Sequence, residues 1–190
     1  MLDKVKIINR ALNLLGQNSI SSDEEENKRT LAMNAAWELV VPELMNTLPW
    51  HFCIKEQRIA KLEETGITDY TSVYLFPSDC IRVLAPIGDK TLRVKVQGDR
   101  IYSNTEELTL KYVSNQYVDD ISKWSIGFGK CISYLLALEC CYILTTSTKR
   151  EDRLTQVYYQ VVLPDTIGSD VLQEVPEQVT NDMVDIGNAY

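Results

Sequence analysis

The chain has a single histidine, His51, which lies between Trp50 and Phe52. Nucleophilic triads and most metal sites use histidine, so a hydrolytic centre would have to form around this imidazole, with Asp79 or Glu56 as its carboxylate partner. No Gly-x-Ser-x-Gly nucleophile motif accompanies it. The sequence therefore favours a structural histidine with satisfied hydrogen bonds, and it assigns no catalytic residue.

Two other segments have the residue types of a ligand site without the required spacing. Gly127-Phe128-Gly129-Lys130 has the glycines and lysine of a phosphate loop, but it matches neither Walker A nor the dinucleotide fingerprint, and apolar helical sequence surrounds it. Asp23-Glu24-Glu25-Glu26 lacks the glycine of a calcium loop, and acids in a row are typical of a helix N-terminus. We therefore expect no cofactor and no metal.

The five cysteines contain no Cys-x-x-Cys pair and are odd in number, which argues against both a zinc site and a disulfide framework. Free cysteine usually behaves as a small core hydrophobe. We therefore expect five reduced, buried thiols, namely Cys53, Cys80, Cys131, Cys140 and Cys141.

A basic strand face is the remaining candidate binding site. It consists of Arg93, Lys95 and Arg100, with Tyr102 and Lys111 nearby. Such a face could contact nucleic acid, but the chain carries a net charge of -8. In so acidic a protein an exposed face or a contact to an acidic neighbour is the better interpretation, and we expect no sequence-specific nucleic-acid binding.

Composition indicates an ordinary globular protein. The 190 residues are 45% apolar and 24% charged, which suits one core without disulfides or metals. No apolar run approaches the roughly 20 residues that span a bilayer, and the N-terminus lacks the pattern of a secretory signal, so we expect a protein made in cytoplasm without a membrane segment. The acidic excess is local, because the segment 165–190 has six acids and no Lys or Arg.

Helical patterns occupy both ends of the chain. Apolar residues at three- and four-residue steps predict a helix over 2–15, with Gly16 as its left-handed cap. The capping-box pattern Ser22-Asp23-Glu24-Glu25 predicts that a second helix begins there, that Pro42 kinks or divides it, and that it ends before Pro49. A central core helix is expected after Asp119 or Asp120, and a fourth helix that Pro164 and Gly168 stop.

Short β-rich stretches separated by glycine and proline fill the middle of the chain. The expected strands are 51–60, 72–76, 79–85, 91–96, 100–102 and 107–113, with a tight hairpin at Gly98. The predicted fold is α+β, a four-helix bundle with an inserted small antiparallel β module and an extended C-terminal tail. The bundle comprises 1–50 and 119–168, the β module 51–118 and the tail 169–190.

The joint between helix and strand and the tail that follows the fourth helix are the candidate interaction elements. Trp50 can plug the bundle where the chain crosses into strands, next to Phe52, and Pro77 with Asp79 shapes a turn. The tail is acidic and amphipathic, and Pro176 forbids one uninterrupted helix, so it suits a segment that becomes ordered on a partner. Its candidate docking residues are Leu172, Val175, Pro176, Val179, Met183, Ile186 and Tyr190.

Three segments carry a family resemblance. The run 11–16 (Ala-Leu-Asn-Leu-Leu-Gly), the joint Trp50-His51-Phe52 and the strand 74–84 (Tyr-Leu-Phe-Pro-Ser-Asp-Cys-Ile-Arg-Val-Leu) come in this order. Over roughly residues 5–165 the chain resembles the head-to-tail adaptor proteins of short-tailed bacteriophages, the tail tubular protein A family. It departs from them at Pro42 and in its cysteine-rich third helix.

The resemblance implies a virion structural protein, a head-tail connector and not an enzyme. Its copies would form a ring oligomer, most often of twelve, between the portal protein and the tail nozzle protein at the head-tail interface, with tail fibres as a further partner. The genome would pass through the ring during DNA ejection, the tail would dock on the portal, and assembly would take place in host cytoplasm. Two alternatives stay open, namely another phage head- or tail-completion protein and a small hydrolase-like enzyme centred on His51.

Overall fold

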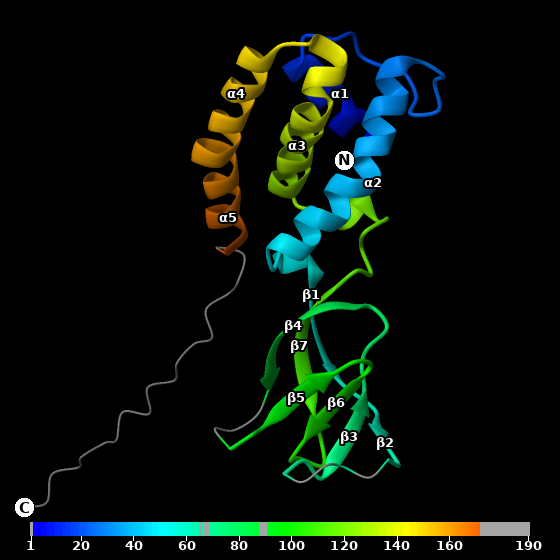
Figure 1. The fold of residues 1–190 in the computed structure, drawn as a ribbon, viewed down its shortest axis with the longest axis vertical. Coiled ribbons are helices and arrows are strands. Elements are labelled where there is room, and N and C mark those ends of the chain that lie inside the picture. The colour runs from blue at the N-terminus through cyan, green and yellow to red at the C-terminus, as the bar shows by residue number, and fades with distance from the viewer. Residues whose placement is uncertain (1, 65, 67–68, 88–90, 172–190) are drawn as a thin grey trace, which may run out of the picture.

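The computed structural model describes residues 2–64, 66, 69–87 and 91–171. It has a mixed α+β fold in which helices from both ends of the chain gather at one end of the molecule and two antiparallel sheets lie at the other (Figure 1). The helical end is called the helical part below and the other the strand part. The predicted docking residues Leu172, Val175, Pro176, Val179, Met183, Ile186 and Tyr190 lie outside the described residues.

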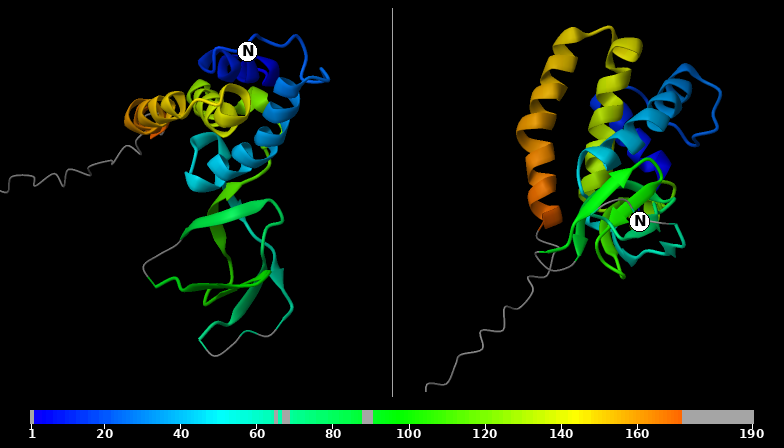
Figure 2. Two further views of the ribbon diagram at one scale, coloured as in Figure 1. Left: turned by 45° about the horizontal axis from the view of Figure 1, so that its top comes forward. Right: turned by 60° about the horizontal axis from the view of Figure 1, so that its bottom comes forward.

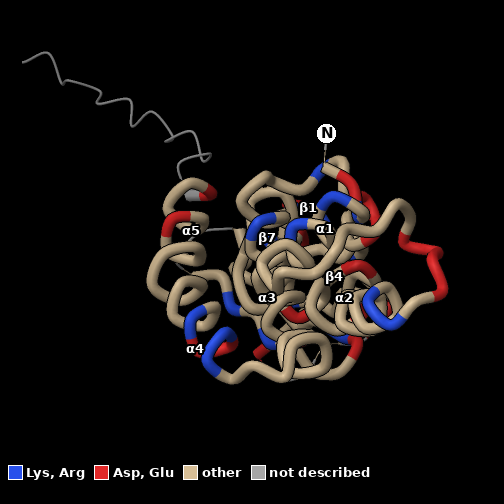
Figure 3. Tube along the Cα trace, turned by 90° about the horizontal axis from the view of Figure 1, so that it is seen from above, with Lys and Arg blue, Asp and Glu red and all other residues tan. Residues whose placement is uncertain are grey.

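The helical part is organised around one central helix. The helices are α1 (Lys4–Leu14), α2 (Lys28–Thr47), α3 (Ile126–Thr145), α4 (Thr148–Val157) and α5 (Leu163–Val171). A π-helical segment, η3 (Tyr158–Val162), joins α4 to α5 without a break. As expected, α3 packs against α1, α2, α4 and α5, and α2 and the α4–α5 helix stand on opposite sides of it (Figures 2 and 3).

The first two helices begin and end at polar caps. Asp3 caps α1, and Gly16 has the predicted left-handed conformation at φ +66°. The predicted start of α2 is wrong. Ser22 and Glu25 do form local hydrogen bonds with backbone N–H groups, but in a turn, and the helix begins at Lys28 because Asn27 accepts hydrogen bonds from the amides of Arg29 and Thr30.

Pro42 lies inside α2, which continues undivided from Lys28 to Thr47. Of the two predicted effects of Pro42, a kink or a division of the helix, the division does not occur. Trp37, Val40, Val41, Leu44 and Met45 are buried before and after the proline. This apolar packing on both sides of Pro42 holds the helix together despite the missing hydrogen bond.

The central helix starts later than expected. Asp120 caps only a short 3₁₀ turn, η2 (Ile121–Lys123), and Ser125 caps α3. By length and hydropathy alone α3 could cross a membrane, contrary to the expectation that no run of the chain is apolar over about 20 residues. Half of its apolar window is buried inside the protein.

The fourth helix continues through Pro164 and Gly168 to Val171, so the prediction that these residues stop it is wrong. In η3 the amide of Leu163 donates to the carbonyl of Tyr158, five residues earlier. This wider turn relieves the clash between the Pro164 ring and the preceding carbonyls, so the helix continues although Pro164 has no N–H to donate. Residues 169–171, expected in the tail, therefore belong to a helix.

The strand part contains two small antiparallel sheets, with orders β1-β7-β4 and β2-β3-β6-β5. The strands are β1 (Ile54–Arg58), β2 (Lys61–Leu62), β3 (Ser72–Leu75), β4 (Cys80–Ile87), β5 (Val94–Gln97), β6 (Arg100–Ser103) and β7 (Thr109–Ser114). The hairpin at Gly98 is confirmed, since this glycine has φ +62° and Gln97 pairs with Arg100. His51–Cys53 form a 3₁₀ turn, η1, instead of the expected strand start.

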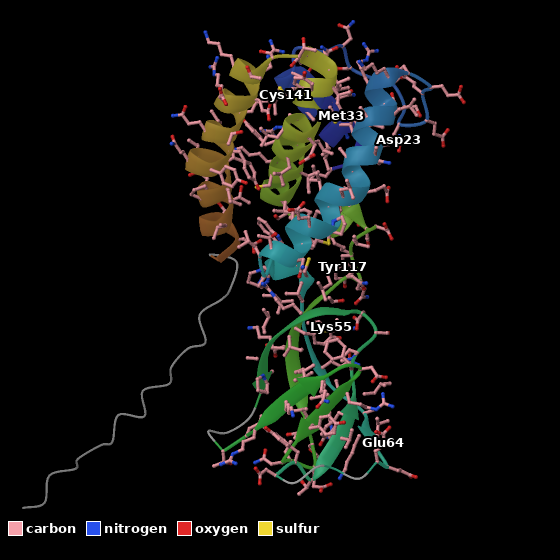
Figure 4. All side chains as sticks on the ribbon, viewed as in Figure 1. Asp23, Met33, Lys55, Glu64, Tyr117 and Cys141 are labelled. Atoms are coloured by element: carbon pink, nitrogen blue, oxygen red, sulfur yellow. The ribbon has the colours of Figure 1, made fainter. Side chains whose placement is uncertain are left out.

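Two apolar clusters fill the protein. The larger one joins the helices and includes Val113 of β7, with Ile81 and Leu84 of β4 packed against it. The smaller one lies between the sheets around Tyr74 and Tyr112. The sheet β1-β7-β4 thus connects the helical part with the strand part. Figure 4 places Lys55 at the end of the strand part that meets the helices and Glu64 at its far end.

Candidate assembly surfaces

An aromatic cluster encloses the chain where it crosses from α2 into β1. Trp50 is buried, with 1% of its surface exposed, and its Nε1 donates a 2.9 Å hydrogen bond to the carbonyl of Leu44. Phe128 of α3 is met edge-on by Trp50, Phe52 and Trp124, with ring centroids 5.1, 5.0 and 4.9 Å away. Edge-to-face rings at these separations attract each other beyond their burial. The cluster therefore fixes the end of α2 against the start of α3.

The Pro77–Asp79 turn connects β3 with β4. The Cys80 amide donates to the Pro77 carbonyl at 3.0 Å, and the Asn115 amide donates to the Asp79 carbonyl at 2.9 Å. This second bond ties the turn to the residue that follows β7. The turn therefore lies on the sheet that meets the helices.

The Asp79 carboxylate receives donors from two neighbouring strands. Lys55 Nζ lies 2.9 Å from Oδ2, Ser114 donates at 2.8 Å, and the Tyr112 hydroxyl is 3.0 Å from Oδ1. Partial burial opposes ionisation of this carboxyl, but the hydrogen bonds outweigh it and hold the pKa of Asp79 below its usual value. The hydrogen bond to Asp79 raises the pKa of Lys55. The pKa of Tyr112 is also raised, chiefly by burial and in addition by the contact with Asp79.

Asp170 of α5 is a polar contact at the joint that the sequence did not identify. Its surface is 8% exposed, Oδ2 accepts the backbone N–H of His51 at 2.7 Å, and Oδ1 is buried without a hydrogen-bond partner among the described residues. The sequence placed Asp170 in the acidic tail. Thr166, one helical turn earlier, is also buried, so both residues lie on the inward face of α5. The burial of two polar side chains is not visible in the sequence.

The glycines of Gly127-Phe128-Gly129 serve helix packing. A Cβ on Gly127 would lie 2.6 Å from Cγ2 of Thr166, so α3 and α5 approach closely there. A Cβ on Gly129 would lie 2.9 Å from a methyl group of Leu2. This segment forms the first turn of α3 and does not connect a strand to a helix, as a phosphate loop does.

The residues of the hydrolase alternative are engaged elsewhere or exposed. The His51 side chain is exposed, so the prediction of a fully satisfied histidine holds only for its backbone N–H. Asp79 is held by Lys55, and Glu56 forms an ion pair with Lys111. Within the described ranges no three His, Cys, Asp or Glu side chains gather as metal ligands.

The cysteines and the basic strand face differ in part from expectation. All five thiols are free, and four are buried, whereas Cys80 is half-buried. On the strand face, Arg100 pairs with Glu64 and Asp99, and Lys111 with Glu56. Lys111 of β7 belongs to the other sheet, so it is not part of the face that carries Arg100. The paired acids neutralise part of the positive charge of both residues.

An apolar stripe runs along the outer side of α2. Leu31 and Leu39 are 64% and 68% exposed, and the exposed Ala35 and Pro42 continue the line at helical spacing. These four residues are called the α2 stripe below. Isolated exposed leucines are ordinary, but an aligned row on one helix face is typical of an interaction surface.

A second apolar surface is a groove of about 520 Å³ between α2 and the α4–η3 helix, with α3 as its floor. Leu48, Leu135, Leu138, Tyr142, Tyr159 and Leu163 line it, together with Glu43, Glu139 and Glu151. We call it the acidic groove. Tyr142 and Tyr159 at its edge are 64% and 60% exposed. At about 100° per residue, Leu39 of the α2 stripe lies about 100° around the helix from Val40 and about 140° from Leu44, both of which line this groove.

Sequence comparisons with protein-family models and with curated proteins found no match for this chain. Its function is therefore inferred from its own residues and surfaces.

Proposed function

We propose that the chain is a structural head-to-tail adaptor of a short-tailed bacteriophage, without catalytic activity, whose copies form a ring between portal and tail nozzle. The observation that carries the proposal is the pair of apolar surfaces that face in different directions, the α2 stripe and the acidic groove. The α2 stripe is a convex ridge and the groove is concave, so the stripe of one copy fits the groove of the next.

Two different surfaces that fit each other produce head-to-tail contacts and not a two-fold dimer. Repeated around an axis, such contacts close into a ring when the rotation per copy permits it. In this arrangement the four helices act as one bundle, and each copy contributes the α2 stripe to one neighbour and the acidic groove between α2 and the α4–η3 helix to the other. The positions of these helices on opposite sides of α3 support it.

The remaining parts are assigned to the axial partners. The strand part projects from the helices and would contact the nozzle or fibres, while residues 172–190 would dock on the portal. Since the net charge is -8, an acidic lumen would repel the phosphates of passing DNA and avoid salt-dependent adhesion. A head- or tail-completion protein of another phage type would share the ring but differ in its axial position, which a density map of the virion distinguishes.

The test is ring formation by the full chain mixed with the portal of the same phage, measured by mass photometry and negative-stain imaging. Closed rings of one size on the portal are expected. Leu39→Glu should abolish them without unfolding the protein, because the side chain is exposed. Val96→Glu, a 45% exposed position in the strand part, is the matched control. Persistent monomers of the unmodified chain in the presence of portal, or intact rings with Leu39→Glu, would contradict the proposal.

A further inference from the structure

A pocket of about 670 Å³ with a positive lining lies between α1 and α4. Lys149, Arg150 and Arg153 of α4 contribute to it, and Tyr134 of α3 lies between the two helices. Among the described residues no carboxylate lines it. Leu14 and Val157 give it an apolar surface. Arg150 already donates to the carbonyl of Leu15. Lys149 and Arg153 are exposed, and they are the cations that can bind an acidic ligand.

A second pocket, of about 780 Å³, continues along the same side of α3. Its charged lining residues are Lys123, Lys130, Asp165 and Asp170, and Lys130 lies one turn before Tyr134. Over the two pockets five cations therefore stand against two carboxylates. Because Lys130 and Tyr134 share a helix face, the two pockets follow each other along α3. Together they are called the basic groove. The described part of the chain ends at residue 171, next to the lower end of this groove.

The sequence that follows residue 171 has the complementary chemistry. Arg153 is the last cation of the chain, and the segment 172–190 has four acids, Glu174, Glu177, Asp182 and Asp185. Five apolar residues recur there at three- and four-residue steps, namely Leu172, Val175, Val179, Met183 and Ile186. A segment with acids and a repeated apolar pattern fits a groove with cations and an apolar floor.

The length of the segment suffices to reach the groove. Along the continuous α4–α5 helix, Val171 is about 21 Å from Val157, about 27 Å from Arg153 and about 33 Å from Lys149. The fourteen residues from Val171 to Asp185 span about 21 Å when helical and about 46 Å when extended, so the acids reach both cations when part of the segment is extended. Attachment to the same chain also gives the segment a high effective concentration at the groove, of the order of mM.

We propose that residues 172–190 dock in the basic groove of their own chain before assembly, with their acids at Lys149 and Arg153 and their apolar residues on Leu14 and Val157. Docking in this position hides the segment from other partners. Any partner that binds the segment must first displace it, so the contact keeps the unassembled protein from premature association. The proposal concerns the isolated chain and does not depend on the identity of that partner.

Zero-length carbodiimide cross-linking of the purified full chain tests the contact directly. The protein is mixed as equal amounts of ¹⁴N- and ¹⁵N-labelled chains, and cross-linked peptides are identified by mass spectrometry. Cross-links from Glu174, Glu177, Asp182 or Asp185 to Lys149 or Lys130 within one isotope are expected. Lys55 and Asp79, 2.9 Å apart, provide an internal positive control.

Three outcomes overturn the proposal. Mixed-isotope cross-links at Lys149 would show that the groove binds the segment of another copy. Cross-links from the segment to strand-part lysines in place of Lys149 and Lys130 would place it elsewhere. The Lys55–Asp79 cross-link without any cross-link from the segment would leave the groove unoccupied.

Cleavage by a glutamate-specific protease gives a second measurement on the same protein. Reversing two exposed cations, Lys149→Glu with Arg153→Glu, should accelerate cleavage at Glu174 and Glu177 about tenfold, since each surface charge pair contributes a factor of about two to five and reversal adds repulsion. Higher salt should have a similar effect. The control, Arg93→Glu with Lys95→Glu, makes the same charge change in the strand part and should leave cleavage unchanged. Equal rates in both variants would overturn the proposal.

Discussion

Replacing Asp79 by Asn tests whether this carboxylate holds the strand part to the joint. Asn keeps the shape of the side chain but removes the charge that Lys55 contacts at 2.9 Å, and its amide group cannot accept from Ser114 and Tyr112 at the same time. Hydrogen bonds to a charged group contribute about 1.5–3 kcal/mol. Asp79 and Lys55 are 26% and 37% exposed, so solvent screening reduces this value.

We therefore expect Asp79→Asn to lower the free energy of unfolding by about 1.5 kcal/mol near neutral pH. For a chain of this size the melting temperature should fall by about 3–6 °C. The measurement is urea unfolding followed by far-ultraviolet circular dichroism, with the slope m unchanged. The control is Glu107→Gln, which removes a pair with Arg58 whose side chains are 66% and 65% exposed and should cost less than about 0.5 kcal/mol.

The pH dependence of the same variant distinguishes lost charge from altered packing. The folded pKa of Asp79 lies below its ordinary value, so its contribution to stability is present above the unfolded pKa and disappears as pH falls through the folded pKa. The Lys55 pKa is raised, so its contribution is lost only when pH rises through that higher value. The difference between wild type and Asp79→Asn should be constant near neutrality and shrink at acid pH. A difference that is negligible at neutral pH, or equally large in acid, would refute the reasoning.

Two further predictions concern the helical part. Gly127→Ala should lower the free energy of unfolding by about 1–2 kcal/mol, because the clash of the new methyl group with Cγ2 of Thr166 costs more than the higher helix propensity of alanine gains. Adding Thr166→Ser, which removes Cγ2, should recover part of this loss in urea unfolding. An unchanged stability of Gly127→Ala would contradict the close approach of α3 and α5. Burial raises the pKa of Cys53 to about 12, with help from Asp170, and that of the half-buried Cys80 to about 11. Near pH 8 a thiol reagent should therefore label the folded protein slowly, and it should label Cys80 before Cys53. Peptide mass spectrometry identifies the labelled residue. Fast labelling of Cys53 would mean that this thiol is accessible to solvent.

The parts of the fold that the sequence predicts well depend on local chemistry. Gly98 has no Cβ and can adopt positive φ, so its hairpin follows from neighbouring residues alone. The apolar circumference of 126–145 requires contacts on several sides, and α3 has them. The strands β3, β4, β6 and β7 begin and end within two residues of the expected positions, because short stretches rich in β-branched and aromatic residues alternate there with turn residues. The expected strand 91–96 differs more, since β5 begins only at Val94.

The parts of the fold that the sequence predicts wrongly depend on competition between local signals or on contacts between distant residues. Ser22 and Asn27 are both good caps, and Asn27 starts α2. Pro164 ends a helix unless the preceding turn widens, and the π-helical segment before it is not visible in a local pattern. The exposed Leu39 illustrates the same limit, because helical periodicity alone gave no means to separate it from the buried Val40.

Because the fourth helix continues to Val171, its last turn contacts the crossing from α2 to β1. Asp170 connects the last turn of α5 to the backbone of His51, at the point where α2 passes into β1. Residue 172 follows two positions later, so a partner that binds the segment 172–190 acts on a helix end already fixed to the crossing between helical and strand parts. Asp170 is buried and one of its oxygens lacks a partner among the described residues, so the burial of this carboxyl group lowers the stability of the protein. The Asp170 carboxylate thus joins the helix that precedes the C-terminal segment to the chain crossing that leads into the strand part.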